Sequence, residues 1–562
     1  MIKRYFIFTI FFLLTRIGLF AVPPPAPSAG VVERELEKEY EAKPLDQEKT
    51  VPAIQIDIPE KRLEMPDGQK VLINRIEVKG NECISTKEII SKSKCYLNKK
   101  LSLKDIYELC YYIENIYARK GYFLARAYPP PQAIENGSLL IEVIEGKLGN
   151  IEVVGNKYYT KEFILSYFTE LQNKALRYDD FLQALMLVND NSDLMVGSVF
   201  QKGKEFGYAD VILRVNDARP IHLYLNANNY GRNLTTNFRA GGRLDWGNLF
   251  TQGDKFSVAE VVGFPINALY FTDLIYNVPL NRKGASLEAA YLFSKFTIEE
   301  LTSLHLKGRS DIATLKFNQA LIRKRSLSMD LFTYFDFKQI QNFVLSSRSS
   351  FDKLRVLTFG TSLDHFIPMQ GRDYLVLRLA AGIPNFLGGL KAVDKNSSRR
   401  GGGGRFFIFN MDYDRIQYLP KDCFFYFHGS GQLSPSKLTL PEQIYIGGVD
   451  TIRGFPLAAA LGDNGYYLNF EFRLPPPILA NKCFFMLHKK KWKDIIQFDA
   501  FLDHGGVFLQ SEKDSFLWGS GLGVRVNGPY NFVFNLDVGF PLNHRDDNRG
   551  VFTYIKVTCQ AF

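Results

Sequence analysis

The C-terminal part of the chain is dominated by a period-two alternation, and this pattern constrains the fold more than any other feature. In residues 531–540, aromatic and aliphatic side chains alternate with Asn535 and Asp537. Because successive side chains of a strand point to opposite faces, such a segment has one apolar face and one polar face. Residues 465–474 and 516–526 alternate in the same way.

Strand candidates of this kind recur from Ile221 to the end of the chain. Sixteen can be placed, and they begin near residues 221, 234, 254, 267, 284, 308, 324, 352, 373, 402, 421, 464, 493, 515, 530 and 551. An even number of spans of about ten residues predicts a transmembrane β-barrel that is apolar outside and polar inside. Aromatic residues make up 14% of the chain, which fits the aromatic girdles of such a barrel. We assign residues 218–562 to an all-β, 16-stranded outer-membrane barrel.

The N-terminus has the pattern of a secretory signal peptide over residues 1–21. Lys3 and Arg4 precede an apolar core, and Ala21 is a suitable cleavage position. Beyond it, no window holds the ~20 continuous apolar residues of a membrane helix. The chain is therefore predicted to be exported.

Two modules precede the barrel, at residues 71–149 and 150–217. Each has strand and helix candidates in a similar order, and each begins with a strand ending in Gly-Asn, so they form an internal repeat. In the first, a capping box from Ser102 to Asp105 marks the start of a helix. A small mixed sheet offers an open edge to which an extended client can add as a strand. The alternative is that both modules are spacers.

Two short motifs suggest a charged contact inside the barrel. One is Ile452, Arg453, Gly454 and Phe455 in a long connection; the other is Phe501, Asp503 and Gly505 on one face of a strand. If that face lines the lumen, the Asp503 carboxylate needs a cation, and the Arg453 guanidinium can bind it through two hydrogen bonds. Glu471 and Arg525 lie on inward faces and are further candidate lumen partners. In the alternative, Arg453 is solvated and Asp503 only lines the lumen.

The two motifs, in this order and on these elements, resemble those of the two-partner secretion transporters (TpsB), a family of POTRA-bearing outer-membrane barrels. The modules resemble two POTRA domains. The resemblance implies a pore in the outer membrane of a Gram-negative-type bacterium, with periplasmic POTRA domains that bind a large, β-rich, TpsA-like client. It also implies contact with outer-membrane lipid, insertion by the barrel assembly machinery, and a plug helix with a Pro-rich linker in residues 22–70. A disordered acidic tail is the alternative for that last segment.

The sequence indicates no catalytic chemistry. Of the six cysteines, Cys83 and Cys95 are the candidate disulfide pair, and no cysteine or histidine cluster has metal-ligand spacing. We therefore predict no enzyme, cofactor or metal. We also predict no nucleic-acid partner, because the net charge of +10 is spread along strands and turns. Two other functions stay open: a barrel assembly insertase resembling BamA, and a passive porin-like or adhesin barrel.

Overall fold

The computed structural model describes most of the chain. The described residues are 29–40, 53–56, 68–191, 193–231, 236–266, 268–298, 305–367, 369–484, 487–509, 514–528, 531–543 and 550–562. The predicted signal peptide, residues 1–21, lies outside them. Within these ranges, every helix is too short or too polar to cross a membrane.

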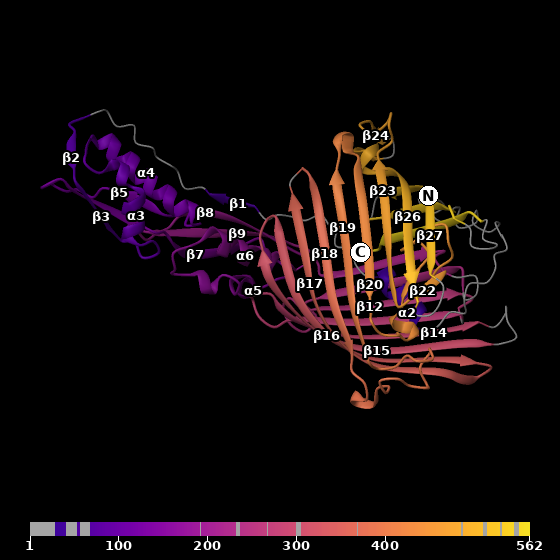
Figure 1. The fold of residues 1–562 in the computed structure, drawn as a ribbon. Helices are drawn as coiled ribbons and strands as arrows, with labels where there is room; N and C mark the ends of the chain where they lie inside the picture. Colours follow the sequence, from indigo (N-terminus) through magenta and orange to yellow (C-terminus); the bar gives the residue numbers. More distant parts are fainter. Residues whose placement is uncertain are drawn as a thin grey trace.

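The C-terminal strands form one closed antiparallel ring (Figure 1). Its sixteen strands are β10 (Ile221–Asn228), β11 (Phe238–Gly247), β12 (Lys255–Phe264), β13 (Leu269–Pro279), β14 (Ala285–Ile298), β15 (Leu306–Arg323), β16 (Leu327–Val344), β17 (Ser347–Ile367), β18 (Gly371–Gly382), β19 (Phe406–Tyr418), β20 (Phe424–Leu433), β23 (Asn464–Leu474), β26 (Ile496–Phe508), β27 (Ser515–Asn527), β28 (Val533–Pro541) and β29 (Phe552–Gln560). The last strand closes the ring on the first, with Tyr224 opposite Gln560. The predicted fold class is confirmed, and every strand begins within five residues of its predicted start.

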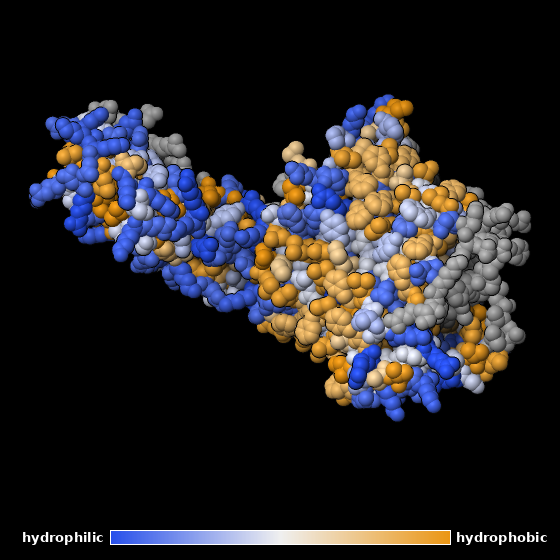
Figure 2. Space-filling model, viewed as in Figure 1, coloured by the Kyte–Doolittle hydropathy of each residue, from blue (hydrophilic) through white to orange (hydrophobic). Residues whose placement is uncertain are grey.

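The two faces of the barrel wall differ as the alternation predicts. On β27 the outward Leu522 is 64% exposed, whereas the inward Asp537 of the neighbouring β28 is 2% exposed. Figure 2 shows the barrel surface as largely hydrophobic and the N-terminal modules as mostly hydrophilic. An outward apolar wall with polar groups inside is stable only when the wall faces lipid.

Each N-terminal module packs helices on a small mixed sheet. The first contains β2 (Val71–Ile73), β3 (Arg75–Lys79), α3 (Thr86–Lys92), η3 (Lys94–Tyr96), β4 (Lys99–Leu101), α4 (Leu103–Arg119), β5 (Arg126–Tyr128) and β6 (Ser138–Ile144). The second contains β7 (Lys147–Val154), α5 (Lys161–Leu165), η4 (Thr169–Leu171), α6 (Tyr178–Asn189), β8 (Leu194–Lys202) and β9 (Tyr208–Asp217). Their sheets have the strand orders β3-β6-β5 and β1-β8-β9-β7.

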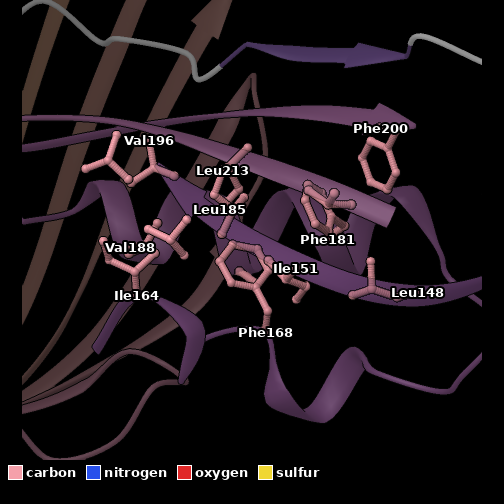
Figure 3. Packing of buried hydrophobic residues seen from close by; sticks show 14 of the residues in the cluster. Leu148, Ile151, Ile164, Phe168, Phe181, Leu185, Val188, Val196, Phe200 and Leu213 are labelled. Atoms are coloured by element: carbon pink, nitrogen blue, oxygen red, sulfur yellow. The ribbon is translucent and has the colours of Figure 1, made fainter. Parts of the chain in front are cut away.

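The helices form where the sequence provides both a cap and an apolar stripe. The predicted capping box at Ser102 and Asp105 is present at the start of α4, and Leu109, Ile113 and Tyr117 on one face of that helix are buried. In the second module, Figure 3 shows the apolar side chains of α6 facing those of the sheet strands. Each module therefore has a hydrophobic core of its own.

One strand of the second sheet comes from far upstream. β1 (Ile54–Ile56) pairs in parallel with β8, with Ile54 opposite Ser198, and the Ser198 N–H donates to the Ala53 carbonyl at 2.9 Å. This segment lies within the predicted linker. The edge that β8 would otherwise expose is thus covered by the chain itself.

Aromatic and charged contacts join the modules to each other and to the barrel. The Phe123 ring of the first module lies edge-on to Tyr178 and Phe200 of the second, with centroids 5.7 and 5.2 Å away. Arg323 at the end of β15 forms an ion pair with Asp190 at 2.9 Å. The end of the barrel carrying Arg323 is therefore the end next to the modules.

The predicted disulfide is wrong. Cys83 and Cys95 are both free thiols, and they lie on opposite sides of α3. The seven residues of α3 alone rise about 10 Å, beyond the ~6 Å between the Cα atoms of a disulfide. Both cysteines belong to the first module, but the helix between them keeps them apart.

Candidate functional site

The connection between β20 and β23, residues 434–463, folds back into the barrel; we call it the inward loop. It contains η7 (Leu440–Glu442) and a short antiparallel pair, β21 (Ile444–Ile446) and β22 (Ala460–Gly462). Its apolar residues, with Ile452 and Phe455 among them, form a buried cluster with Tyr467, Val507 and Leu517 of the wall. Apolar packing thus holds the loop against β23, β26 and β27.

At the tip of the inward loop, Arg453 binds Asp503 on β26. The guanidinium Nε and Nη2 donate to the two carboxylate oxygens at 2.7 and 2.8 Å, and the Arg453 backbone N–H donates at 3.0 Å. Arg453 is 3% exposed and Asp503 is 0% exposed. Three charge-assisted hydrogen bonds to one buried carboxylate make this contact strong and directional.

Other side chains complete the site around the guanidinium. Nη1 donates to Glu471 Oε1 on β23 at 2.6 Å, and it lies 3.9 Å from Asp537 Oδ1 on β28. The ring of Phe501 lies 3.6 Å from the guanidinium carbon, a cation–π distance. One cation from the loop therefore contacts three wall strands, β23, β26 and β28, through carboxylates and a ring.

Glycines let the loop backbone reach the wall. Gly454 has φ of 91°, and a Cβ there would lie 2.7 Å from the Phe540 carbonyl carbon. A Cβ at Gly519 of β27 would lie 1.8 Å from the Arg453 carbonyl oxygen. The missing side chain at Gly519 thus leaves room on the wall for the loop tip.

The backbone of the tip is also held by polar side chains of the wall. Tyr554 on β29 donates its hydroxyl to the Phe455 carbonyl at 2.9 Å and accepts the Gly454 N–H at 3.2 Å. Asn469 on β23 donates to the Thr451 carbonyl. The polar groups of the site therefore bind one another and fasten the inward loop to the wall. We call the contacts of Arg453 with Asp503 and Glu471 the latch.

Comparison with known sequences identifies the family. The sequence profile described as haemolysin secretion/activation protein ShlB/FhaC/HecB matches residues 207–526, and the profile of the ShlB-type POTRA domain matches residues 71–146. The first match covers more than half of the chain. The chain belongs to this family of secretion proteins.

Full-length relatives agree with this assignment. The heme/hemopexin transporter protein HuxB of Haemophilus influenzae strain 86-028NP is 24% identical over 556 residues, which cover 93% of this chain and 92% of that protein. The outer membrane transporter CdiB of Dickeya dadantii is 21% identical over 464 residues, covering 80% and 79%. The structure of CdiB from Escherichia coli matches with a TM-score of 0.74 at 19% identity, over 97% of this chain and 100% of that chain. The chain is a two-partner secretion transporter of the outer membrane, with its POTRA domains in the periplasm.

The predicted site residues of this transporter do not all meet. Arg453 contacts Asp503, Phe501 and Glu471. Arg525 does not contact the loop tip; it pairs with Asp537 at 2.7 Å and reaches the latch only through that carboxylate.

Sequence reasoning missed several groups that hold the latch. Asp537 and Gly519 had been assigned only to an inward strand face, and Tyr554 to no site. A second anchor, at the base of the inward loop, was also missed: Arg399 Nη1 donates to the buried Asp463 at 2.5 Å. A single sequence shows only that these residues occupy inward-facing positions of their strands. It does not show which residues of distant strands pair with one another.

The lumen also holds a helix, α2 (Ala29–Tyr40), drawn inside the ring of strands in Figure 1. Ala29, Val32 and Leu36, spaced as one helical face, pack against inward apolar residues of β12–β16. The Ala29 N–H donates to Asn342 Oδ1 at 2.8 Å, and Val31 packs against the inward loop. In the sequence, this segment was a candidate for either a plug or an acidic tail.

Proposed function

We propose that this transporter captures an unfolded, β-rich partner protein on its POTRA domains and passes it through the barrel when α2 leaves the lumen. The observation that carries the proposal is the strand pairing of β1 with β8, because the same chain segment runs on into the plug. Only residues 41–53 separate α2 from β1. Binding at the β8 edge is therefore coupled mechanically to the content of the lumen.

Capture follows from the chemistry of a sheet edge. β1 binds β8 through main-chain hydrogen bonds over three residue pairs, and Ile56 is 49% exposed. A longer client strand can replace so short a strand, because it makes more main-chain bonds to the same edge. Main-chain recognition also tolerates varied client sequences.

The pore opens when α2 leaves the lumen, whereas the contacts of the latch remain in place. Arg453, Asp503 and Glu471 keep the inward loop against the wall, so that the space vacated by α2 becomes the path of the client. The proposal includes no enzymatic step and no cofactor. Folding of the client outside the cell supplies the direction of transport.

A comparison of secreted proteomes tests the function. Outer membranes and culture supernatants are compared between cells with and without the gene. Loss of one or two large surface or secreted proteins, with other barrels unchanged, is the expected result. A fall in many barrel proteins would instead indicate an assembly insertase, and no change in either fraction would indicate a passive porin.

A reversible cross-link tests the coupling. Ile54→Cys and Ser198→Cys place two thiols on paired residues of β1 and β8. The oxidised double variant should stop exporting its client, and reduction should restore export, because the client then regains the β8 edge. Each single variant is the control under the same oxidant. Export that continues at the normal rate with the cross-link formed would rule out client binding at this edge.

A further inference from the structure

The outer wall carries a one-sided band of cations at the external ends of β14–β17. The outward side chains there include five basic residues: Lys295, Lys307, Arg309, Arg348 and Lys353. One carboxylate, that of Asp311, also lies at an outward position there, and it pairs with Arg309 at 2.7 Å. We call these five residues the cationic band.

The band brings several cations close together, and the Asp311 carboxylate pairs with one of them, Arg309. Lys295 and Arg309 lie directly opposite each other on β14 and β15, and like charges at such positions repel. The Arg309 side chain is 53% exposed. The Lys353 ammonium lies 4.6 Å from the centre of the Phe351 ring, and that ring also lies under Arg348. Cations held at fixed places on a stiff sheet form a site that an anion can bridge.

The band lies at the height of the lipid headgroups. Outward positions of β15 from Leu321 to Ala313 are mostly apolar, and Leu315 is 54% exposed. Ten residues of a strand tilted by about 40° rise roughly 26 Å, close to the height of the apolar band of such barrels. Counted from Leu321, at the POTRA end, this rise ends near Asp311. The cations therefore lie where acyl chains give way to headgroups.

An apolar knob stands beside the band. Phe386 and Leu387 protrude from η5 (Phe386–Gly388) on the outer wall, and they are 45% and 60% exposed. The knob is anchored by Arg355, which is 2% exposed and donates to the Leu387 carbonyl at 2.9 Å. A buried arginine on a lipid-facing wall destabilises the protein unless its N–H groups donate hydrogen bonds. The hydrogen bond to Leu387 therefore fixes the position of the knob.

The opposite side of the barrel differs. At the external ends of β23, β26 and β27, outward positions hold Tyr466, Phe508, Phe516 and Trp518, an ordinary aromatic girdle. The cationic band is thus a patch on one side and not a ring around the barrel. A general affinity for the membrane surface would not require this asymmetry.

We propose that the cationic band and the knob bind a phosphorylated glycolipid of the outer leaflet, with its phosphates between Lys295, Arg309 and Lys353 and its acyl chains against Phe386 and Leu387. Charge complementarity selects an anionic headgroup, and the spread of the cations over β14, β15 and β17 suits a headgroup with more than one phosphate. Such a lipid would orient the barrel in the outer leaflet and stiffen β14–β17, three of which (β14, β15 and β16) are among the strands on which α2 rests.

The test uses the full chain in detergent, with native mass spectrometry to measure bound lipid. The probes are lipopolysaccharide with a bis-phosphorylated lipid A, its dephosphorylated form, and phosphatidylglycerol. Lys295→Gln with Lys353→Gln should weaken binding of the phosphorylated glycolipid about 30-fold, since each lysine near an anionic surface contributes about a factor of five. Lys421→Gln with Lys482→Gln, on exposed residues at the periplasmic rim, is the matched control and should bind as the wild type does.

The lipid series tests the proposal without any variant. The dephosphorylated glycolipid should bind the wild type about as weakly as the phosphorylated form binds the double variant. Equal binding of both glycolipids, or equal binding by wild type and double variant, would overturn the proposal. Phosphatidylglycerol binding as tight as the glycolipid, with the same dependence on the two lysines, would also overturn it, because the patch would then be a site for any anionic lipid.

Discussion

The lumen contains two inserted segments, and they are fastened by opposite kinds of interaction. The inward loop is held by Arg453, whose guanidinium makes charge-assisted hydrogen bonds to Asp503 and Glu471. Helix α2 is held mostly by apolar side chains, with Val32 and Leu36 fully buried against the wall. The first contact is directional and depends on geometry; the second is non-directional and depends on area.

This difference indicates which segment moves during transport. Removing one partner from a buried ion pair costs about 3–5 kcal/mol, because the remaining charge is left unpaired in a place that water does not reach. Burying one Val or Leu side chain contributes about 1.5–3 kcal/mol, and that contribution can be replaced by any other apolar surface. A client chain that enters the lumen can therefore substitute for α2, whereas it offers no ready substitute for Arg453. The loop should stay latched while the helix leaves.

The largest effect is expected from Arg453→Ala. The substitution leaves Asp503 and Glu471 buried without the cation, at a cost of about 3–5 kcal/mol, and we expect export to fall at least about tenfold. The barrel should still insert, which heat-modifiable migration on a gel can verify. Arg453→Lys keeps the charge but loses the two-pronged bond, so its export should be intermediate. Normal export by the alanine variant would mean that the latch has no role in transport.

A steric change tests the same latch without altering charge. A Cβ at Gly519 would lie 1.8 Å from the Arg453 carbonyl oxygen, so Gly519→Ala should push the loop tip off β27 and reduce export strongly. Gly431→Ala is the matched control, because a Cβ there has its nearest neighbour 3.9 Å away. Both variants add one methyl group to a barrel strand. Equal export by the two would show that the loop tip shifts without consequence.

The plug should respond in the opposite direction. Leu36→Ser removes a fully buried apolar side chain from α2 and should weaken its packing by about 2–3 kcal/mol, so that the pore opens more often. Channel recordings in planar bilayers should show a higher open fraction, with export kept near normal. Leu36→Met, which conserves volume, should behave as the wild type does. An unchanged open fraction in the serine variant would mean that apolar packing is not what keeps α2 in the lumen.

The latch was predictable from the sequence to an unusual degree, and the reason is parity. In a strand, the face of a residue depends only on whether its position is odd or even, so Asp503 could be placed in the lumen as soon as Phe498 and Leu502 were assigned to lipid. A buried carboxylate then requires a cation. Arg453 lies in a loop long enough to return into the barrel, which made it the candidate.

Contacts that depend on how the ring closes were not predictable in this way. Tyr554 and Asp537 have the inward parity, but their distance from Arg453 depends on the stagger of strands β26–β29, which a single sequence does not encode. β1 is only three residues long, too short for any periodicity, and it pairs with a strand more than 140 positions away. The Cys83–Cys95 prediction failed for a related reason: the two cysteines belong to one module, but this does not make their side chains neighbours.

A fall in pH should have the smallest effect on stability. It should act on the second POTRA domain, which holds β1, and not on the contact between Arg453 and Asp503. β1 rests on the second POTRA domain, where the Asp217 carboxylate accepts the N–H groups of Lys157, Tyr158 and Tyr159 at 2.6–3.0 Å. Burial alone would raise the pKa of Asp217, but these three N–H groups outweigh it and hold the pKa below its usual range. A carboxyl with a lowered folded pKa stabilises the domain above the pKa of the unfolded chain, and this contribution is lost as the pH falls through the folded pKa.

Asp217→Asn isolates this contribution from every other acid-sensitive group. The amide keeps one acceptor oxygen but not the charge, so the variant should lose about 1 kcal/mol of local stability at pH 7 and lose less than the wild type on further acidification. Hydrogen exchange of the full chain, corrected for intrinsic rates at each pH, measures this through the protection of residues 157–159. If wild type and variant lose protection in parallel as the pH falls, Asp217 does not carry the acid response. If they diverge as expected, and if Arg453→Ala leaves the protection of the same amides unchanged, Asp217 and Arg453 act independently. This is expected, because Asp217 stabilises the domain that carries β1, whereas Arg453 holds the inward loop against a different part of the barrel.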